Sequence, residues 1–506
     1  MTACTQVVSP RGSDDLLEPM YDVFLSFSGA DRESGRALAV ELRALGSRVF
    51  LDEDSIECFS GITDSILNGL RASKMLVAYY SADYAVRAAC QHELMLAFLA
   101  GQRDGDACSR IMVVNPEADT DHVRPIELAD AKFVLPSTDV HTLAQQLAKH
   151  AAAVDRSIGE VRPVERPRWS VRRSGHVRKF VGRYRELWDL HSALHAIDFP
   201  LVNEAACGPI AAVCGLPGAG KSALVAAYAW RFAAAFPGGV DWVSLAGTAP
   251  EPNALLERYT SELDRIAARG NAGLYRVPAE QSADSANQAA PRTRLLVVDD
   301  IPPGVGADVL DVLPLPTDSA VRIIVISEDD VFRTVLPVVR VGPLPAHDAA
   351  ELLDAYRRPD DETDRVARDD LVIGLGANTG ALVAVGDHLR DRHGLSSYRS
   401  SNNELDRTEH LANAVFSRVR QVLDRMTPTE LALLKFADDS GSTVLSTSVL
   451  RALPDIDLVE VGTALKSLLH RSAATRVGTS WQLDPYVVRA ARDQQRSRAA
   501  TAAPQG

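Results

Sequence analysis

The 506-residue sequence predicts an α/β fold class, with parallel sheets covered by helices and a mostly helical region after them. Short apolar runs typical of buried strands alternate with stretches whose apolar residues recur at helical spacing. This alternation occurs twice, within residues 20–155 and within residues 180–345. A chain of this length exceeds what a single core usually holds, so we expect about three or four domains.

The first region, residues 20–155, has the pattern of a sheet with helices on both faces. Its expected strands are residues 21–27, 48–52, 75–81, 110–115 and 132–136. Its expected helices lie at residues 37–45, 62–70, 86–100 and 139–154. Ligands of such folds bind at the carboxyl ends of the strands, so a site is expected there.

A basic linker, residues 156–179, is expected next. Residues 162–185 contain nine Arg or Lys residues and a single acidic one, Glu165. A solvated linker is favoured over an arm that binds nucleic acid, because the net charge of the whole chain is −13. Docking against an acidic face of the same protein is the remaining alternative.

The second α/β region is followed by helices. Its expected strands are residues 210–215, 294–300 and 322–327, with a helix over 221–235 and an exposed insertion over 266–293. After residue 345 we expect a helical domain (346–408) and a helical domain with a small β-wing at 473–484 (409–495). Residues 1–19 and 496–506 are expected to be disordered.

Composition argues against several classes of protein. The acidic charge and a pI of about 5.5 disfavour binding to DNA or to an anionic membrane. The sequence shows no apolar run of about 18 residues and no signal peptide, so we expect a cytoplasmic protein without a membrane partner. None of the six cysteines forms a CxxC pair, which disfavours a zinc site.

The stretch "GLPGAGKS" (215–222) fits the phosphate-binding pattern GxxxxGK[ST] between a strand and a helix. Its glycines let backbone N–H groups converge on phosphate oxygens. Lys221 supplies positive charge, and Ser222 offers a hydroxyl to Mg²⁺. The expected nucleotide-binding residues of this loop are Gly215, Leu216, Pro217, Gly218, Ala219, Gly220, Lys221, Ser222 and Ala223.

The strand "LLVVDD" ends in Asp299 and Asp300. We assign Asp299 to Mg²⁺, together with Ser222, and Asp300 to activation of a water molecule. Two exposed acids at a strand end would be the simpler interpretation if the glycine-rich loop were absent.

With "FVGRYREL" (180–187) and "VGPLPAHDAAELL" (341–353), these motifs resemble the NB-ARC branch of the STAND P-loop NTPases over residues 178–495. The resemblance implies a P-loop α/β NTPase domain (180–345), an α-helical domain and a winged-helix domain. It also implies that ADP holds a closed monomer and ATP an open oligomer, with Val181 and Arg183 near the adenine and ribose.

Three positions depart from the NB-ARC pattern. Glu328 stands where the family often has an arginine, and "NTGALVAV" (378–385) lacks the proline of the family's segment. Asp484 stands at the position of the family's phosphate-sensing histidine. Binding of ATP or ADP is therefore expected, whereas hydrolysis of ATP stays open.

In the first region, "YDVFLSFSGADR" (21–32), "VFLDEDSIECFSGI" (49–62) and "SADYAVRAACQHEL" (81–94) together resemble the TIR domain, which has a flavodoxin-like fold. TIR domains are either adaptor scaffolds or enzymes that cleave NAD⁺. Glu93 matches the catalytic glutamate of the enzymes. The resemblance further implies contacts with NAD⁺ from the loops after the first and second strands, by Phe27, Ser28, Gly29, Asp31, Arg32 and Asp54.

A single carboxylate suits this chemistry, because positive charge develops on the ribose as nicotinamide leaves. A surface charge is the alternative for Glu93. A nucleophilic pair of Cys90 and His92 is rejected, because residues two apart on a helix point in different directions.

Together the motifs predict a bacterial TIR–NB-ARC signalling protein of immune defence, with ATP/ADP and Mg²⁺ as cofactors and NAD⁺ as substrate. Homo-oligomerisation through both modules would activate the TIR domain, and a separate sensor is a further partner. An adaptor TIR domain controlled by the nucleotide switch is the alternative function. A DNA-binding regulator is a third, which the acidic charge disfavours. Whether the product is ADP-ribose or a cyclic isomer stays open.

Overall fold

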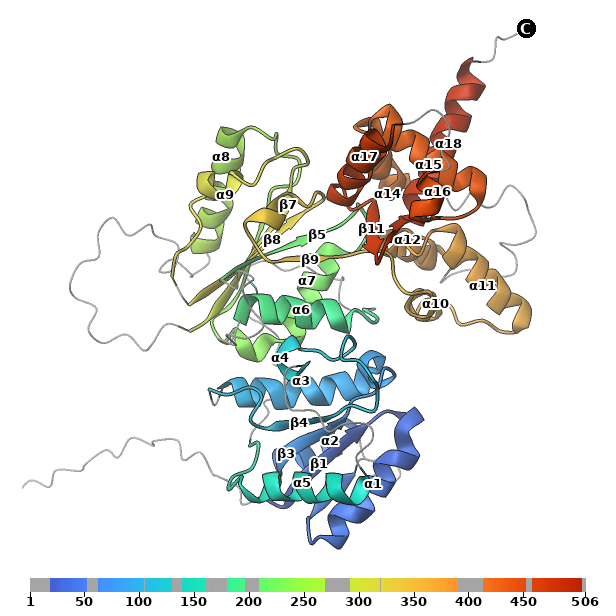
Figure 1. Ribbon diagram of the computed structural model, residues 1–506. Helices are drawn as coiled ribbons and strands as arrows, with labels where there is room; N and C mark the ends of the chain where they lie inside the picture. Colours follow the sequence, from blue (N-terminus) through green and yellow to red (C-terminus); the bar gives the residue numbers. More distant parts are fainter. Residues whose placement is uncertain are drawn as a thin grey trace, which may run out of the picture. The chain divides into compact units, whose positions relative to one another are not determined.

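The computed structural model describes residues 19–51, 62–103, 105–129, 139–159, 169, 180–195, 209–268, 292–318, 320–389, 413–451 and 457–502. The chain divides into two compact units, Met1–Pro163 and Val164–Gly506, and each is described by itself. Figure 1 labels the elements of both units.

The sheet of the first unit contains four described strands in the order β2-β1-β3-β4, and every pair is parallel. These strands are β1 (Tyr21–Phe27), β2 (Val49–Leu51), β3 (Ser73–Tyr79) and β4 (Ile111–Val114). The predicted parallel sheet is thereby confirmed for these strands. The strand predicted at residues 132–136 lies outside the described residues.

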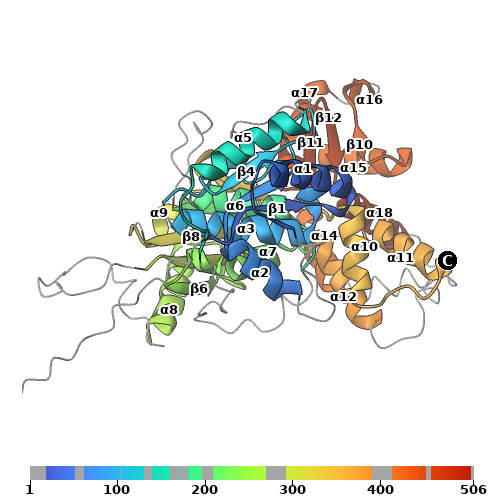
Figure 2. The ribbon, with the colours of Figure 1, turned by 90° about the horizontal axis from the view of Figure 1, so that it is seen from below.

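Helices cover both faces of this sheet. They are α1 (Arg32–Ala44), α2 (Ile62–Arg71), α3 (Ala88–Arg103), α4 (Ile126–Ala129) and α5 (Val140–Ala152). Helices α1 and α5 lie side by side on one face, where Leu42 and Leu147 are buried against the strands (Figures 1 and 2). Helix α3 packs on the opposite face (Figure 1). Because β2 and β3 flank β1 on opposite sides, the carboxyl ends of β1 and β3 form the crevice where such folds bind ligands.

The second unit contains a five-stranded sheet in the order β6-β7-β8-β5-β9, again with parallel pairs. Its strands are β5 (Ile210–Cys214), β6 (Gly239–Ser244), β7 (Arg294–Ile301), β8 (Val321–Ser327) and β9 (Val338–Arg340). Its helices are α6 (Tyr184–His195), α7 (Lys221–Arg231), α8 (Pro252–Ile266) and α9 (Val309–Val312). The helix predicted over 221–235 ends earlier, at Arg231, and a short 3₁₀ helix, Ala233–Ala235, follows it.

The carboxyl-terminal part of this unit is helical and shares one core (Figure 1). Its helices are α10 (Ala346–Asp354), α11 (Glu362–Gly374), α12 (Thr379–Leu389), α14 (Asn413–Asp424), α15 (Pro428–Ser440), α16 (Thr447–Arg451), α17 (Leu458–His470) and α18 (Pro485–Ala502). Leu216 of the glycine-rich loop is buried in the same core. The loop is therefore tied to the helices that follow the sheet.

A small antiparallel sheet completes this region. It consists of β10 (Val444–Leu445), β12 (Ser480–Leu483) and β11 (Ala474–Val477), in that order. The predicted β-wing at 473–484 is confirmed by β11 and β12. The expectation of a disordered tail from residue 496 is wrong for residues 496–502, which continue α18. In the part of the chain that is described, no helix has the length and apolarity needed to cross a membrane.

Candidate functional site

Glu93 lies on α3 and is buried, with only 6% of its surface exposed. The hydroxyl of Ser26, near the carboxyl end of β1, donates a hydrogen bond to its Oε2 atom at 2.5 Å. The same hydroxyl lies 3.0 Å from the phenol oxygen of Tyr84. A buried carboxylate is costly unless it is hydrogen-bonded, so these contacts fix the position of Glu93.

Two groups beside Glu93, the phenol of Tyr84 and the thiol of Cys90, stay uncharged at neutral pH. Burial raises the pKa of Tyr84 well above its ordinary value, and the neighbouring Cys90 and Glu93 raise it further. Tyr84 therefore remains a phenol and donates to the carbonyl of Cys90 at 3.2 Å. Burial, followed by the charge of Glu93, raises the pKa of the Cys90 thiol to about 12. A thiol with so high a pKa is no nucleophile at neutral pH, which agrees with the rejection of a Cys/His pair.

A second cluster joins the carboxyl ends of β1 and β3. Asp31 accepts hydrogen bonds at 2.5 Å from the hydroxyls of Ser28, which follows β1, and Ser81, which follows β3. Phe27 lies between the two clusters: its carbonyl accepts a weak bond from the Cys90 thiol, and its ring lies against Gly35. A Cβ at Gly35 would lie 2.5 Å from that ring, so only glycine permits this approach.

The residues predicted to contact NAD⁺ fall mostly in one segment. Phe27 ends β1, Gly29 begins the 3₁₀ helix Gly29–Asp31, and Arg32 begins α1. Asp54 lies outside the described residues. Ser26, Ser81 and Tyr84 were not predicted. The only sequence signal for Ser26 is a polar residue within the apolar run that follows Asp22, and a buried polar residue requires a partner.

The glycine-rich loop lies between β5 and α7, as predicted. Gly218 and Gly220 have φ angles of +78° and +100°, which favour glycine. The ammonium group of Lys221 donates to the carbonyls of Gly215, at 2.7 Å, and Leu216, at 3.1 Å. Burial lowers the pKa of Lys221, and the charge of Glu328 partly offsets this.

Ser222 and Asp299 meet, although they are distant in sequence. The hydroxyl of Ser222 donates to Oδ1 of Asp299 at 3.0 Å. A hydroxyl and a carboxylate at this spacing are hard oxygen donors of the kind that Mg²⁺ prefers, so the site fits the predicted metal. An irregularity of β7 between Val298 and Ile301 accompanies the positive φ of Asp300, whose carboxylate lies 3.5 Å from the hydroxyl of Ser244.

The amino-terminal end of α12 contacts the glycine-rich loop. The amide of Asn378 donates to the carbonyl of Pro217 at 3.1 Å, and the hydroxyl of Thr379 donates to Ala219 at 3.0 Å. The segment "NTGALVAV" thus contacts the loop without the proline of the NB-ARC pattern. Arg183, with a φ of +59°, donates to the carbonyls of Ala219 and Gly342.

Val181, Glu328 and Asp484, which the sequence also singled out, have other contacts. Val181 packs against the carboxyl-terminal core. Glu328 follows β8 and forms an ion pair with Arg418 of α14 at 2.8 Å. Asp484 is buried and caps the amino terminus of α18, accepting from the backbone of Tyr486 at 2.9 Å. Asp484 is therefore a structural cap in this conformation.

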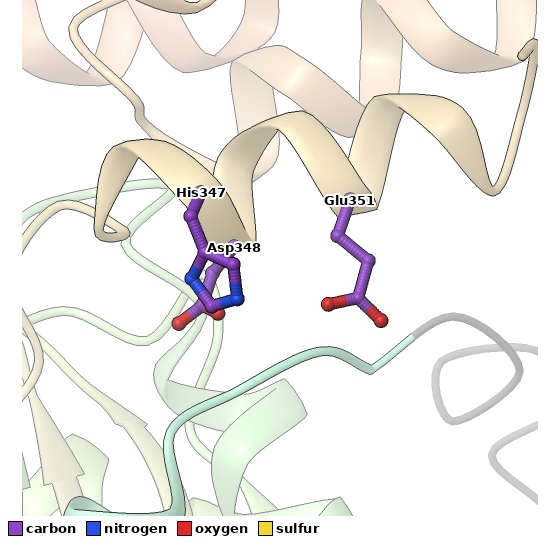
Figure 3. Close-up of side chains that lie close together, drawn as sticks. All are labelled: His347, Asp348 and Glu351. Carbon is purple, nitrogen blue, oxygen red and sulfur yellow. The ribbon is translucent and has the colours of Figure 1, made fainter. Parts of the chain in front are cut away.

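Another cluster has the spacing of metal ligands. Figure 3 shows His347, Asp348 and Glu351 on α10, and within the described residues their ligand atoms lie within 4.8 Å of one another. Asp348 is already paired with His347 at 2.9 Å and packs against Gly182. The pair accounts for the cluster without a metal ion.

The fold and these residues define a chain that joins an α/β domain with a buried glutamate to a P-loop module. A family model of the TIR domain matches residues 23–148. The first unit therefore contains a TIR domain. None of the curated proteins compared with the chain matches it.

Solved structures resemble this chain weakly. The Walker-type ATPase PABY2304 of Pyrococcus abyssi is 14% identical over 64% of this chain and 99% of its own, with a TM-score of 0.43. The Aeropyrum pernix ORC2 protein is 14% identical over 65% and 98%, with a TM-score of 0.36. The STAND protein PH0952 of Pyrococcus horikoshii is 15% identical over 66% and 44%, with a TM-score of 0.27. Similarities this low transfer no function to this chain.

Proposed function

We propose that the protein is a signalling protein in which an ATP/ADP switch controls self-association, and self-association activates a TIR domain that cleaves NAD⁺. The observation that carries the proposal is Glu93, a buried carboxylate held by Ser26 within a TIR domain. It lies beside the carboxyl ends of β1 and β3, where folds of this kind bind ligands.

The proposed reaction breaks the bond between ribose and nicotinamide. Nicotinamide leaves with the bonding electron pair as a neutral molecule, and positive charge develops on the ribose. The carboxylate of Glu93 stabilises that charge, and its fixed orientation means that little reorganisation is needed during the reaction. A water molecule then attacks the ribose and releases a proton to solvent, which gives ADP-ribose. An internal nucleophile of the substrate would instead give a cyclic isomer.

The P-loop module would supply the switch. Lys221 and the backbone of the glycine-rich loop would hold the phosphates, and Ser222 with Asp299 would hold Mg²⁺. The same loop contacts Asn378 and Thr379 of the helical region, so a bound nucleotide would touch the residues that join the loop to that region. Control of assembly by the nucleotide, as in the NB-ARC proteins that the sequence resembles, is part of this proposal.

The test is nicotinamide release from NAD⁺ by the full chain at high concentration with ATP and Mg²⁺. We expect Glu93→Gln to lower the rate by about 10²–10³-fold, the usual effect of removing one electrostatic contact to a transition state. Glu257→Gln, which alters an exposed glutamate of α8, is the matched control and should leave the rate unchanged. Lys221→Ala should abolish stimulation by ATP.

An adaptor TIR domain is the second candidate, and the low exposure of Glu93 favours it. A carboxylate that is 6% exposed and bonded to Ser26 can serve to hold α3 against β1. In that case Glu93→Gln would lower the melting temperature, and neither protein would release nicotinamide at any concentration or nucleotide state. Release by the wild type that survives in Glu93→Gln would contradict the catalytic assignment.

A further inference from the structure

Asp299 lies deep in the second unit, with 1% of its surface exposed, and its two carboxylate oxygens have different partners. Oδ1 accepts from the hydroxyl of Ser222 at 3.0 Å and from the backbone N–H of Asp300 at 2.9 Å. Oδ2 accepts from the indole N–H of Trp242 at 3.2 Å. The oxygen that faces Ser222 is thus separate from the oxygen that faces the indole.

Trp242 is suited to orient this carboxylate without competing with it. It lies on β6, the strand next to β7 in the sheet, and is almost completely buried. An indole N–H donates but cannot accept, so this group does not compete with the Asp299 oxygens as a ligand of Mg²⁺. Its hydrogen bond leaves Oδ1 directed at Ser222, where the metal-binding oxygens meet.

Trp242 in turn is held by a residue of the basic linker. Trp169 stacks on it with ring centroids 5.9 Å apart and the planes 12° from parallel. Trp169 also forms a parallel bridge with Val240 of β6, the edge strand of the sheet. Trp169 belongs to the second unit and lies just after its boundary with the first, at Pro163. A chain of contacts therefore runs from Ser222 through Asp299 and Trp242 to the linker.

We propose that Trp242 is a positioning residue for Mg²⁺ in the nucleotide site and that Trp169 makes the linker sense the occupancy of that site. The inference rests on the proposed nucleotide switch and extends it. Ser222 and Asp299 would hold Mg²⁺, and a change at the carboxylate of Asp299 would also reach the indole N–H of Trp242 that donates to it. Trp169, which stacks on that indole, would then report the occupancy of the nucleotide site.

The first test separates the N–H group from the ring. Trp242→Phe keeps an aromatic ring for Trp169 but removes the donor. In calorimetric titrations of the full chain saturated with adenylyl imidodiphosphate, we expect the apparent affinity for Mg²⁺ to fall by about 10–100-fold, as for other partners of metal ligands. Binding of the nucleotide without Mg²⁺ should not change. Trp481→Phe, on β12, is the matched control.

The positioning role of Trp242 and the proposed nucleotide switch fail in different ways. If the wild type binds the nucleotide with Mg²⁺ and Trp242→Phe requires the same Mg²⁺ concentration within about twofold, the positioning role is refuted while the nucleotide switch stands. If the wild type binds no nucleotide, or Lys221→Ala binds as tightly as the wild type, the nucleotide switch itself is refuted and the inference with it.

The second test observes the linker directly. The chain has five tryptophans, so 5-fluorotryptophan labelling gives five ¹⁹F signals, and the signal missing in Trp169→Phe belongs to Trp169. We expect this signal to shift when Mg²⁺ and nucleotide are added to the wild type but not to Trp242→Phe. The signal of the buried Trp188 should stay in place and report intact folding. A Trp169 signal that ignores Mg²⁺ and nucleotide in the wild type would refute the role of the linker.

Discussion

Among single residues, Asp484 shows how burial changes the role of a carboxyl group. It caps α18 by accepting from the backbone N–H groups of Tyr486 and Val487. Burial raises its pKa to about 7, although these two hydrogen bonds act in the opposite direction. A histidine at this position would carry positive charge at low pH, whereas Asp484 is neutral at low pH and gains negative charge near neutral pH.

This pKa gives the stability of the protein a defined dependence on pH. In the unfolded chain Asp484 loses its proton near pH 4, whereas in the folded protein it keeps the proton up to about pH 7. Between these values the folded state binds more protons, so its stability falls as pH rises, and above about pH 7 the effect is constant. We expect Asp484→Asn to remove this loss, which amounts to about 1.4 kcal/mol per pH unit within the window.

Melting temperatures of both proteins between about pH 5 and pH 8 check the expectation. The difference between Asp484→Asn and the wild type should grow as pH rises and then level off. Asp457→Asn is the matched control, because Asp457 caps α17 in the same way but is exposed. Parallel curves for the wild type and Asp484→Asn would contradict the raised pKa.

Among the elements, sequence patterns predicted those whose signal is local. Strand β1 lies where its apolar run predicted it, and the glycine-rich loop follows its motif. Strand β6 was missed because its buried Asp241 is unfavourable in a strand. Only the folded protein provides its partner, Arg294 of the neighbouring strand β7, at 2.6 Å. Strand β9 was missed because Pro337 directly precedes it, and a proline beside an apolar run argues against a strand.

In the two candidate sites, too, residues within local motifs could be predicted, whereas their distant partners could not. Glu93, Lys221 and Asp299 could be predicted because each lies within a short motif. The partners that orient them could not: Ser26 is 67 residues from Glu93, and Trp242 is 57 residues from Asp299. Contacts over such separations are set by strand order and register, which a single sequence does not reveal.

The contact of α12 and α14 with the glycine-rich loop can be tested at Gly218. A Cβ at Gly218 would lie 2.5 Å from Oδ1 of Asn378 and 2.6 Å from Cγ1 of Val415. We expect Gly218→Ala to lower the free energy of unfolding by about 1–3 kcal/mol through overpacking, in addition to about 1–2 kcal/mol from its left-handed backbone. Hydrogen exchange of α12 should become faster.

Gly247→Ala isolates the contact. Gly247 has a φ of +73°, close to the +78° of Gly218, but nothing lies within 4 Å of the position that a Cβ would take. It should show the backbone effect alone, with unchanged exchange in α12. Equal losses of stability in the two variants would mean that the helical region does not press on the loop.

At the scale of the whole second unit, charges join the sheet to the carboxyl-terminal helices. Glu328 follows β8, at a position where the NB-ARC pattern often has an arginine, and it lies near Arg418 of α14 and near Arg425, which follows that helix. Arg418 lies 2.8 Å from Glu328 and 3.8 Å from Asp300, and Arg425 lies 3.8 Å from Asp329. The negative charges of Asp300, Glu328 and Asp329 are thus offset by these two arginines. Burial lowers the pKa of Lys221, and the positive charge of Arg418 lowers it further. These ion pairs favour the closed packing, by which we mean the arrangement in which α14 lies against the sheet.

Reversing the charge of Arg418 measures how much its ion pair with Glu328 contributes to the packing of α14. Since the side chain of Arg418 is 55% exposed, each pair contributes little, and we expect Arg418→Glu to shift the equilibrium away from the closed packing by about 1 kcal/mol, roughly fivefold. Hydrogen exchange along α14 at low salt reports the shift, which should weaken at high salt through screening. Arg420→Glu, an exposed position on the same helix, controls for charge alone.

The double variant Glu328→Arg with Arg418→Glu decides whether the pair itself matters. It restores attraction between positions 328 and 418 but leaves the new glutamate near Asp300, so recovery should be partial. A double-mutant cycle isolates the coupling, because the two residues are in direct contact and their effects should not add. If the effects of the two single variants simply add, the Glu328–Arg418 pair does not hold α14, and apolar packing does. Arg418 would then act only by lowering the pKa of Lys221.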